Sequence, residues 1–176
     1  MLAGRNNIIN DSNKHYNTPP NYINLIHDFF GVNGIELDPC SNEFSMVDAK
    51  INIKLPDNGL LYDWNNKNVF VNPPYGRSED GTTIKNWIEK GIYAYKKQNA
   101  NIIFLIPVAT NTQHFKLIYE NATGICFLYD TRLKFWLNGE KTAKGCSVSC
   151  CLVLLGNDYD RFKEVFSNNG KCFKVN

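Results

Sequence analysis

The sequence predicts an α/β protein in which helices cover both faces of a mostly parallel sheet, with an antiparallel hairpin near the C-terminus. Short apolar runs of β-forming residues alternate with longer segments whose apolar residues recur at helical spacing. Several of these short runs end at a polar motif that contains proline. The 176 residues are enough for one such domain with a substantial core, and short for one with an added recognition domain.

Composition narrows the class of protein further. The formal net charge is only +2, so binding to nucleic acid would have to rest on a local basic surface. The first segment lacks the apolar core of a signal peptide, and no apolar run reaches about eighteen residues, so we expect a soluble cytoplasmic protein with no membrane partner. The six cysteines show no paired C-x-x-C spacing, which favours reduced thiols over disulfides or a metal site.

The N-terminal part predicts an arm followed by a helix. We expect residues 1–15 to be flexible, because their apolar residues are scattered and follow no period. Thr18 and Pro19 are typical of an N-cap and a first helical residue, and the apolar residues that follow share one face as far as Gly31. The polar residues 16–18 either cap this helix or present polar groups to a carboxylate of a ligand.

A strand is predicted over residues 34–37, and it ends at Asp38-Pro39. Asp38 is either a cap for the next turn or a carboxylate that faces a ligand. The span from Asp38 to Asn72 is too short for two complete βα units, so at least one helix must be reduced to a loop.

The remaining elements are predicted in order along the chain. They are a helix of about two turns over 42–50, a weak strand over 51–55, a turn over 56–59, a strand over 69–71, a surface loop over 77–82, a helix over 84–97, a buried central strand over 101–108, a helix after 109–112, a strand over 125–129 and a short helix over 158–166. Asn138-Gly139 is typical of a hairpin turn, and we expect residues 132–137 to pair antiparallel with residues 148–155.

The segment from Val69 to Gly76 carries the most informative motif. Three β-forming residues lead into Asn72-Pro73-Pro74-Tyr75, and the prolines end the strand. An ordinary Pro-Pro turn closed by Gly76 is the alternative interpretation. Because the carboxyl ends of parallel strands share one edge, where ligands bind, we expect Asp38, Asn72 and Thr110 to converge on one crevice.

This motif offers a specific chemistry. The side-chain oxygen of Asn72 and the carbonyl of Pro73 are two acceptors for the two N–H groups of a planar amine such as adenine N6, and such a pair favours its more nucleophilic pyramidal form. Proline fixes φ, so this carbonyl is held without reorganisation. Tyr75 is expected to stack on the base, a contact that contributes about 1–3 kcal/mol. A base in a duplex must be flipped out to reach such a pocket, and no metal is required.

Several motifs follow one another in a characteristic order. They are Tyr16-Asn17-Thr18-Pro19, Leu37-Asp38-Pro39-Cys40, Gly59-Leu60 with Asp63-Trp64, Val71-Asn72-Pro73-Pro74-Tyr75-Gly76, Trp87-Ile88-Glu89-Lys90, Ile106-Pro107 with Thr110 and Phe115, and Arg132-Leu133-Lys134-Phe135. Over nearly the whole chain after the arm, this order resembles the phage-type Dam-like DNA N6-adenine methyltransferases. Asn-Pro-Pro-Tyr alone is shared with protein-glutamine and some RNA methyltransferases, whereas the spacing between the motifs is more specific.

The resemblance implies a reduced Rossmann-like class I methyltransferase fold that uses S-adenosyl-L-methionine and acts on DNA. It implies catalytic roles for Asn72, Pro73, Pro74 and Tyr75, and cofactor binding by Tyr16, Thr18, Pro19, Asp38, Pro39, Cys40, Asp63 and Asn72. It also implies a single methyltransferase domain over residues 16–176 with no separate target-recognition domain, in the cytoplasm of a bacterium or phage-infected host. The motifs specify no oligomeric state.

DNA contacts must then come from loops. The candidate side chains are basic, and residues 138–145 form the hairpin that we expect to face a groove or the phosphates. The candidates are Arg77, Lys85, Arg132, Lys134, Lys141 and Lys144. Solvated surface charge is the alternative for each of them.

Two other functions stay open at this point. A protein-glutamine methyltransferase would use the same pocket on an amide nitrogen, although the chain is short for a separate partner-binding domain. A catalytically inactive DNA-binding relative is suggested by residues 41–44, which lack the glycines that let backbone approach the cofactor in larger amino-methyltransferases. Thr131 also stands where the family places glycine.

Overall fold

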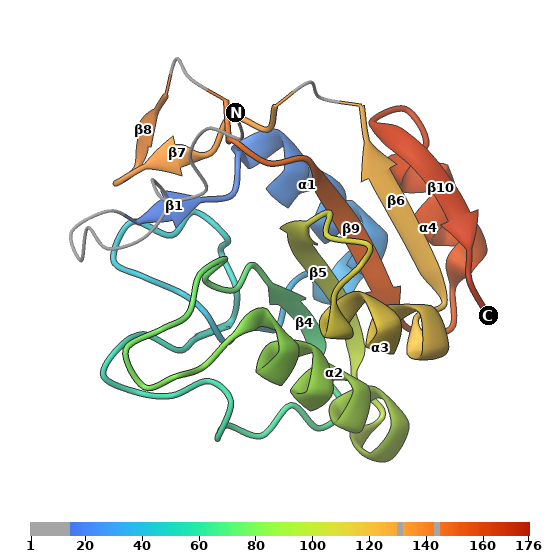
Figure 1. Cartoon of the computed structure of the whole chain (residues 1–176), viewed down its shortest axis with the longest axis horizontal. Helices are drawn as coiled ribbons and strands as arrows, with labels where there is room; N and C mark the ends of the chain where they lie inside the picture. The colour runs from blue at the N-terminus through green and yellow to red at the C-terminus, as the bar shows by residue number, and fades with distance from the viewer. Residues whose placement is uncertain (1–14, 130–131, 143–144) are drawn as a thin grey trace.

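The computed structural model of the chain describes residues 15–129, 132–142 and 145–176 (Figure 1). Its centre is a sheet in which the strands lie in the order β10-β6-β9-β5-β4-β2-β3. These strands are β2 (Leu37–Asp38), β3 (Ile51–Asn52), β4 (Asn68–Val71), β5 (Asn101–Pro107), β6 (Gly124–Leu128), β9 (Cys150–Leu155) and β10 (Gly170–Lys174). Strands β2 to β6 run in one direction, and β9 and β10 run in the other. The predicted mostly parallel sheet is confirmed.

Helices cover both faces of this sheet (Figure 1). Helices α1 (Pro20–Phe30) and α4 (Tyr159–Phe166) lie on one face, and α2 (Ile84–Gln98) and α3 (Gln113–Asn121) lie on the other. A short 3₁₀ helix, η1 (Gly31–Asn33), follows α1. Side chains of β5 alternate between the two layers: Ile103 and Leu105 pack with α1 and α4, whereas Ile102, Phe104 and Ile106 pack with α2 and α3. The result is a three-layer α/β architecture.

The helix predicted over residues 42–50 is wrong, because this segment is irregular in the structure. The Asn42 side chain accepts the N–H of Phe44 at 2.9 Å, the Ser45 hydroxyl accepts the N–H of Val47 at 3.3 Å, and Asp48 has a φ of 53°. Such local side-chain bonds compete with helix formation. No helix lies between β2 and β4, so the expected reduction of the fold is confirmed.

The hairpin prediction is correct for the turn and wrong for the pairing. Asn138 and Gly139 both have positive φ, and they join β7 (Trp136–Leu137) to β8 (Glu140–Lys141). Strand β7 also pairs with β1 (Tyr16–Asn17), which makes a separate three-stranded sheet.

Residues 148–155 do not pair with residues 132–137. Their strand, β9, lies between β5 and β6, and it is antiparallel to both. All residues of β9 are buried, and a strand that is apolar on both faces belongs in the centre of a sheet rather than in an exposed ribbon. Strand β10 was not predicted, because its outer residues are exposed and its pattern is weakly apolar.

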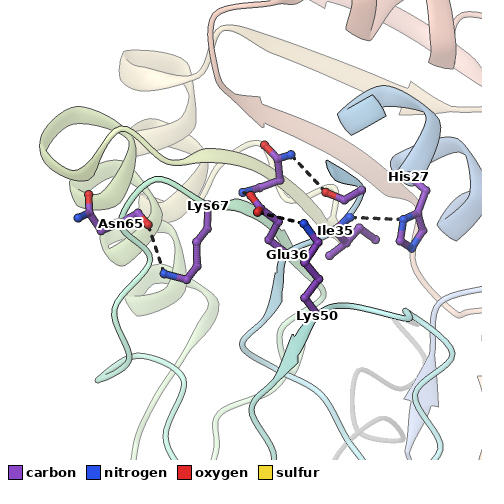
Figure 2. A network of polar contacts seen from close by, with 8 residues as sticks. His27, Ile35, Glu36, Lys50, Asn65 and Lys67 are labelled. Atoms are coloured by element: carbon purple, nitrogen blue, oxygen red, sulfur yellow. Dashed lines mark hydrogen bonds and ion pairs between the residues drawn. The ribbon is translucent and has the colours of Figure 1, made fainter. Parts of the chain in front are cut away.

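A polar network holds the amino ends of β2 and β4 (Figure 2). Glu36 accepts hydrogen bonds from Lys50 Nζ at 3.3 Å and from the N–H of Asn68 at 3.0 Å, and the N–H of Ile35 donates to His27 Nδ1 at 3.3 Å. These contacts lie at the end of the sheet opposite the carboxyl ends. They therefore position the strands without occupying the edge where the site is predicted.

Candidate active site

The candidate site lies at β2, where the order of the strands in the sheet reverses: β3 is added on one side of β2, and β4 and β5 are added on the other. Strand β2 pairs in parallel with β3 on one side and with β4 on the other, and β4 pairs in parallel with β5. Asp38 and Asn72 therefore stand at the same edge, at the carboxyl ends of adjacent strands. Ligands of open α/β sheets bind in the crevice at such a point.

Asn72 is held by a residue far away in the sequence. Its Nδ2 donates a hydrogen bond of 3.2 Å to the hydroxyl oxygen of Thr18. No residue that the structure describes donates to the side-chain oxygen of Asn72 or to the carbonyl of Pro73. The two acceptors that the sequence singled out are both without a donor from the described protein.

Thr18 does not act as the predicted N-cap. Helix α1 begins at Pro20, its N-cap is Pro19, and no side chain caps it. The Thr18 side chain is instead turned into the protein, with 2% of its surface exposed, and it meets Asn72 there. The segment before α1 therefore contributes directly to the site.

Asp38 is a buried carboxyl group with local donors. It is 4% exposed, and it accepts the N–H of Cys40 at 3.0 Å and the hydroxyl of Ser45 at 3.3 Å. Burial raises the pKa of Asp38 to about 6, and the hydrogen bonds from Cys40 and Ser45 oppose this shift. The predicted turn cap is thus confirmed, and the carboxyl oxygens keep further acceptor capacity.

Tyr75 is anchored at its hydroxyl end. The hydroxyl donates to the carbonyl of Leu105 at 3.4 Å and lies 3.8 Å from the sulfur of Cys150, while the ring packs edge-on against Phe135 at 5.8 Å between centroids. Burial raises the pKa of Tyr75 well above its ordinary value, so the side chain stays neutral. The ring is therefore fixed by its contacts with Leu105, Cys150 and Phe135 rather than freely displayed.

Comparison with known protein families matches residues 5–173 to DNA N-6-adenine-methyltransferase (Dam). The chain belongs to the Dam family. The match covers every motif on which the resemblance rests, and it supports an enzyme that methylates adenine in DNA. A search of curated proteins finds no match.

Two features of this Dam-family chain bear on its partners. Within the described residues, no helix is long and apolar enough to cross a membrane. The same residues contain no group of three or more His, Cys, Asp or Glu side chains placed to hold a metal ion. All six cysteines are free in the structure.

The structure gathers most of the predicted cofactor residues. Tyr16 is exposed, Pro19 and Pro39 are buried, and Cys40 is half-buried. Burial and the nearby Asp38 raise the pKa of the Cys40 thiol. The segment with Tyr16 and Pro19 meets the loop after Asp38, so both parts of the predicted set belong to one region.

Asn17 and Asn42 make this connection, and neither was predicted to be a site residue. Nδ2 of Asn17 donates to Oδ1 of Asn42 at 3.0 Å, and Oδ1 of Asn17 is buried without a hydrogen-bond partner. The available signal was the position of Asn17 between two predicted residues, Tyr16 and Thr18. Nothing in the local sequence indicated its partner.

Asp63 is not brought to the other residues. It is exposed, and it accepts hydrogen bonds from Gln98 Nε2 at 2.9 Å and from the N–H of Asn65 at 3.1 Å. Gln98 ends α2 just before the amino end of β5. Asp63 therefore lies towards the edge of the sheet opposite Asn72.

The predicted DNA-binding residues differ in how free their charges are. Lys85 forms an ion pair with Glu89 at 3.1 Å, and Arg132 donates to the carbonyl of Ser147. Three of the predicted side chains are exposed and have no partner among the described residues. They are those of Arg77, Lys134 and Lys141. Lys144 lies outside the described residues.

Surface hollows of about 380 and 560 Å³ lie elsewhere on the molecule. Both are lined by Tyr95, Asn157 and Asp158, which flank the amino end of β5. They contain none of the predicted site residues. We place the candidate site by the strand ends and the acceptor geometry instead.

Proposed function

We propose that this Dam-family protein transfers a methyl group from S-adenosyl-L-methionine to N6 of a flipped-out adenine in DNA, held by Asn72-Pro73-Pro74-Tyr75. The observation that carries the proposal is the pair of open acceptors on Asn72 and Pro73, at the carboxyl edge of the sheet next to buried Asp38. The family match supports the substrate.

The two acceptors suit the chemistry of an exocyclic amine. The amine has two N–H groups, and acceptors on both favour the pyramidal form whose lone pair is available for attack. The Pro73 carbonyl is held by the fixed φ of proline, and Asn72 is held through Thr18, so neither needs to reorganise. Asn72 polarises the amine without taking its proton in the ground state.

The residues near Asp38 fit S-adenosyl-L-methionine, which supplies an electrophilic methyl group when bound. Its ammonium group requires acceptors, and Asp38 and the unpartnered Oδ1 of Asn17 are buried acceptors. Its carboxylate requires donors, and Thr18 keeps a hydroxyl proton that no described residue accepts. We include Tyr16, Pro19, Pro39 and Cys40 in this set and leave out Asp63.

Gly59, in a later loop, lies very close to the turn that carries Asp38. A Cβ added at Gly59 would lie 2.0 Å from the carbonyl oxygen of Pro39, so only glycine lets this loop approach the Asp38-Pro39 turn. This contact joins two protein segments, so Gly59 lets its loop pack against the turn that carries Asp38.

The fold supports the same proposal. The reversal of strand order at β2 is the switch point of a doubly wound sheet, and we propose a reduced Rossmann-like class I methyltransferase fold acting as one domain over residues 16–176. Arg77, Lys134 and Lys141 would contact phosphates while the base leaves the duplex. We place this activity in the cytoplasm of a bacterium or phage-infected cell, where DNA is accessible.

The test is transfer of label from S-adenosyl-L-methionine to unmodified duplex DNA, with N6-methyladenine identified by mass spectrometry. Asn72→Ala should lower the single-turnover rate about 100-fold or more, as when a fixed catalytic hydrogen-bond group is removed, and should keep the circular-dichroism spectrum. Asn65→Ala, an exposed asparagine outside the site, is the control and should retain the wild-type rate.

The outcomes separate the alternatives. Label on a protein glutamine, with none on DNA, would replace the proposal with a protein-glutamine methyltransferase. No transfer, with no heat and no thermal shift on titration with S-adenosyl-L-methionine, would indicate an inactive DNA-binding relative. An unchanged rate in Asn72→Ala would remove the pocket assignment.

A further inference from the structure

The contact between Asn72 and Thr18 bears on which end of the Asn72 amide is open to a substrate. An asparagine side chain carries an acceptor and a donor that differ little in shape. In the structure Nδ2 donates to Thr18 Oγ1 at 3.2 Å, which leaves Oδ1 as an acceptor without a donor among the described residues. The reverse orientation would present Nδ2, which cannot accept a hydrogen bond from an amine.

Thr18 is itself firmly placed. Its side chain is 2% exposed, and it precedes two consecutive prolines, which restrict its backbone to extended conformations. The residue before it, Asn17, pairs with Trp136 in the small sheet and bonds to Asn42 in the loop after Asp38. The Thr18 oxygen is therefore a fixed reference point for Asn72.

We propose that Thr18 is a positioning residue, whose hydroxyl oxygen accepts a hydrogen bond from Nδ2 of Asn72 and so holds Oδ1 towards the target amine. This inference rests on the proposed function. It goes beyond the cofactor role predicted for Thr18, because it assigns the hydroxyl an effect on the methyl-transfer step.

The hydroxyl also connects the two halves of the site. A hydroxyl that gives its proton to another group is left to accept from Nδ2 of Asn72, whereas a hydroxyl with a free proton is able either to accept from Nδ2 or to donate to Oδ1. Among the described residues none accepts the Thr18 proton. An anionic acceptor on the bound cofactor would take the hydrogen bond of the Thr18 hydroxyl proton. The Thr18 oxygen would then only accept, and only the orientation with Nδ2 towards Thr18 would make a hydrogen bond.

Two substitutions separate the hydroxyl from the shape of the side chain. Thr18→Val keeps the volume and removes the acceptor, and Thr18→Ser keeps the hydroxyl. In single turnovers of the preformed enzyme–cofactor–DNA complex, we expect Thr18→Val to be about 10- to 100-fold slower, as for outer partners that orient a functional group, and Thr18→Ser to stay within about 3-fold of wild type. Affinity for DNA should be equal in all three proteins.

Thr123→Val is the matched control. The Thr123 hydroxyl donates to the carbonyl of Gly156 at the opposite edge of the sheet, so this variant also loses a hydrogen bond of a partly buried threonine. It should reduce stability and leave the single-turnover rate unchanged. A wild-type rate in Thr18→Val, or an equal loss of rate in Thr18→Ser, would overturn the positioning role.

A readout without cofactor keeps the two proposals apart. The side-chain amide protons of Asn72, assigned from their absence in Asn72→Asp, should exchange with water at least about 10-fold faster in Thr18→Val than in wild type or Thr18→Ser. Equal exchange in all three would overturn the positioning role. If wild-type protein methylates no DNA but shows the slow exchange, the proposed function fails and the Thr18–Asn72 contact stands.

Discussion

At the scale of single residues, the site depends on side chains whose partners are distant in sequence. Asn72, Asp38 and Tyr75 were all predicted from the polar groups that follow β-forming runs, because a chain-breaking proline marks where a strand ends. The contacts that orient them were not predicted. The Thr18 oxygen accepts a hydrogen bond from Asn72, and the Leu105 carbonyl accepts one from the Tyr75 hydroxyl. Both bonds exist only because the chain folds back between these positions.

Because Asp38 is buried, we expect the free energy of unfolding to depend on pH through its carboxyl group. Its pKa is about 6 in the folded protein and 3.8 in an exposed carboxyl, so the folded state binds the proton more tightly than the unfolded state. The ionised carboxylate therefore opposes folding increasingly as pH rises from about 4 through 6, and fully above that. Asp38→Asn, which carries no charge, should be more stable than wild type by about 2–3 kcal/mol at pH 7.5 and about equal at pH 4.

Urea unfolding at both pH values measures this difference. A stability difference that stays constant with pH would contradict a buried ionised carboxylate. Calorimetric titration should show weaker binding of S-adenosyl-L-methionine by Asp38→Asn, because the acceptor loses its charge. If Asp38→Asn is more stable than wild type but binds S-adenosyl-L-methionine more weakly, the Asp38 carboxylate serves ligand binding at a cost in stability.

At the scale of secondary structure, the small sheet of β1, β7 and β8 links the basic hairpin to the site. Strand β1 pairs with β7, and the next residue after β1 is Thr18. The hairpin turn was predictable because its positive φ values need only Asn138 and Gly139. Its second partner, β1, was not, since two-residue strands leave no readable alternation.

The exposed lysines of this hairpin region predict salt-dependent DNA binding. Lys134→Ala and Lys141→Ala should each weaken binding to duplexes of any sequence and reduce the slope of log affinity against log salt by about 1, because each lysine would release one counterion. Affinity for S-adenosyl-L-methionine should not change. Lys97→Ala, an exposed lysine near the end of α2, is the control.

Fluorescence anisotropy with a labelled duplex at several salt concentrations measures these slopes. If Lys97→Ala lowers affinity as much as the hairpin substitutions do, the hairpin is not the DNA-facing element. A slope that is unaltered in Lys141→Ala would remove that residue from the phosphate contacts.

At the scale of the whole molecule, the two helical layers fix how closely the chain packs on the sheet. Helix α2 lies against β5 through Gly91, where an added Cβ would be 2.6 Å from the ring of Phe104. Phe104 is fully buried, so its ring has no room to withdraw. The close packing of α2 on β5 therefore depends on glycine at position 91.

Gly91→Val should lower the free energy of unfolding by about 1–3 kcal/mol, since overpacking forces strain into a dense core. Tyr93→Val places the same side chain at an exposed position of the same helix and should change stability by less than about 0.5 kcal/mol. Urea denaturation of the two variants gives the comparison. Equal effects in the two variants would contradict packing against Phe104 as the cause, since valine has a higher helix propensity than glycine and about the same as tyrosine.

The sequence by itself determined the α/β class, most helices and strands, and the presence of Asp38 and Asn72 at strand ends, because apolar periodicity and proline act over a few neighbouring residues. Only the tertiary structure decided that β9 enters the middle of the sheet, that Asp63 lies towards the opposite edge, and that Thr18 contacts Asn72. These outcomes depend on which distant surfaces bury one another and which distant donors meet which acceptors. Spacing along the chain does not encode them.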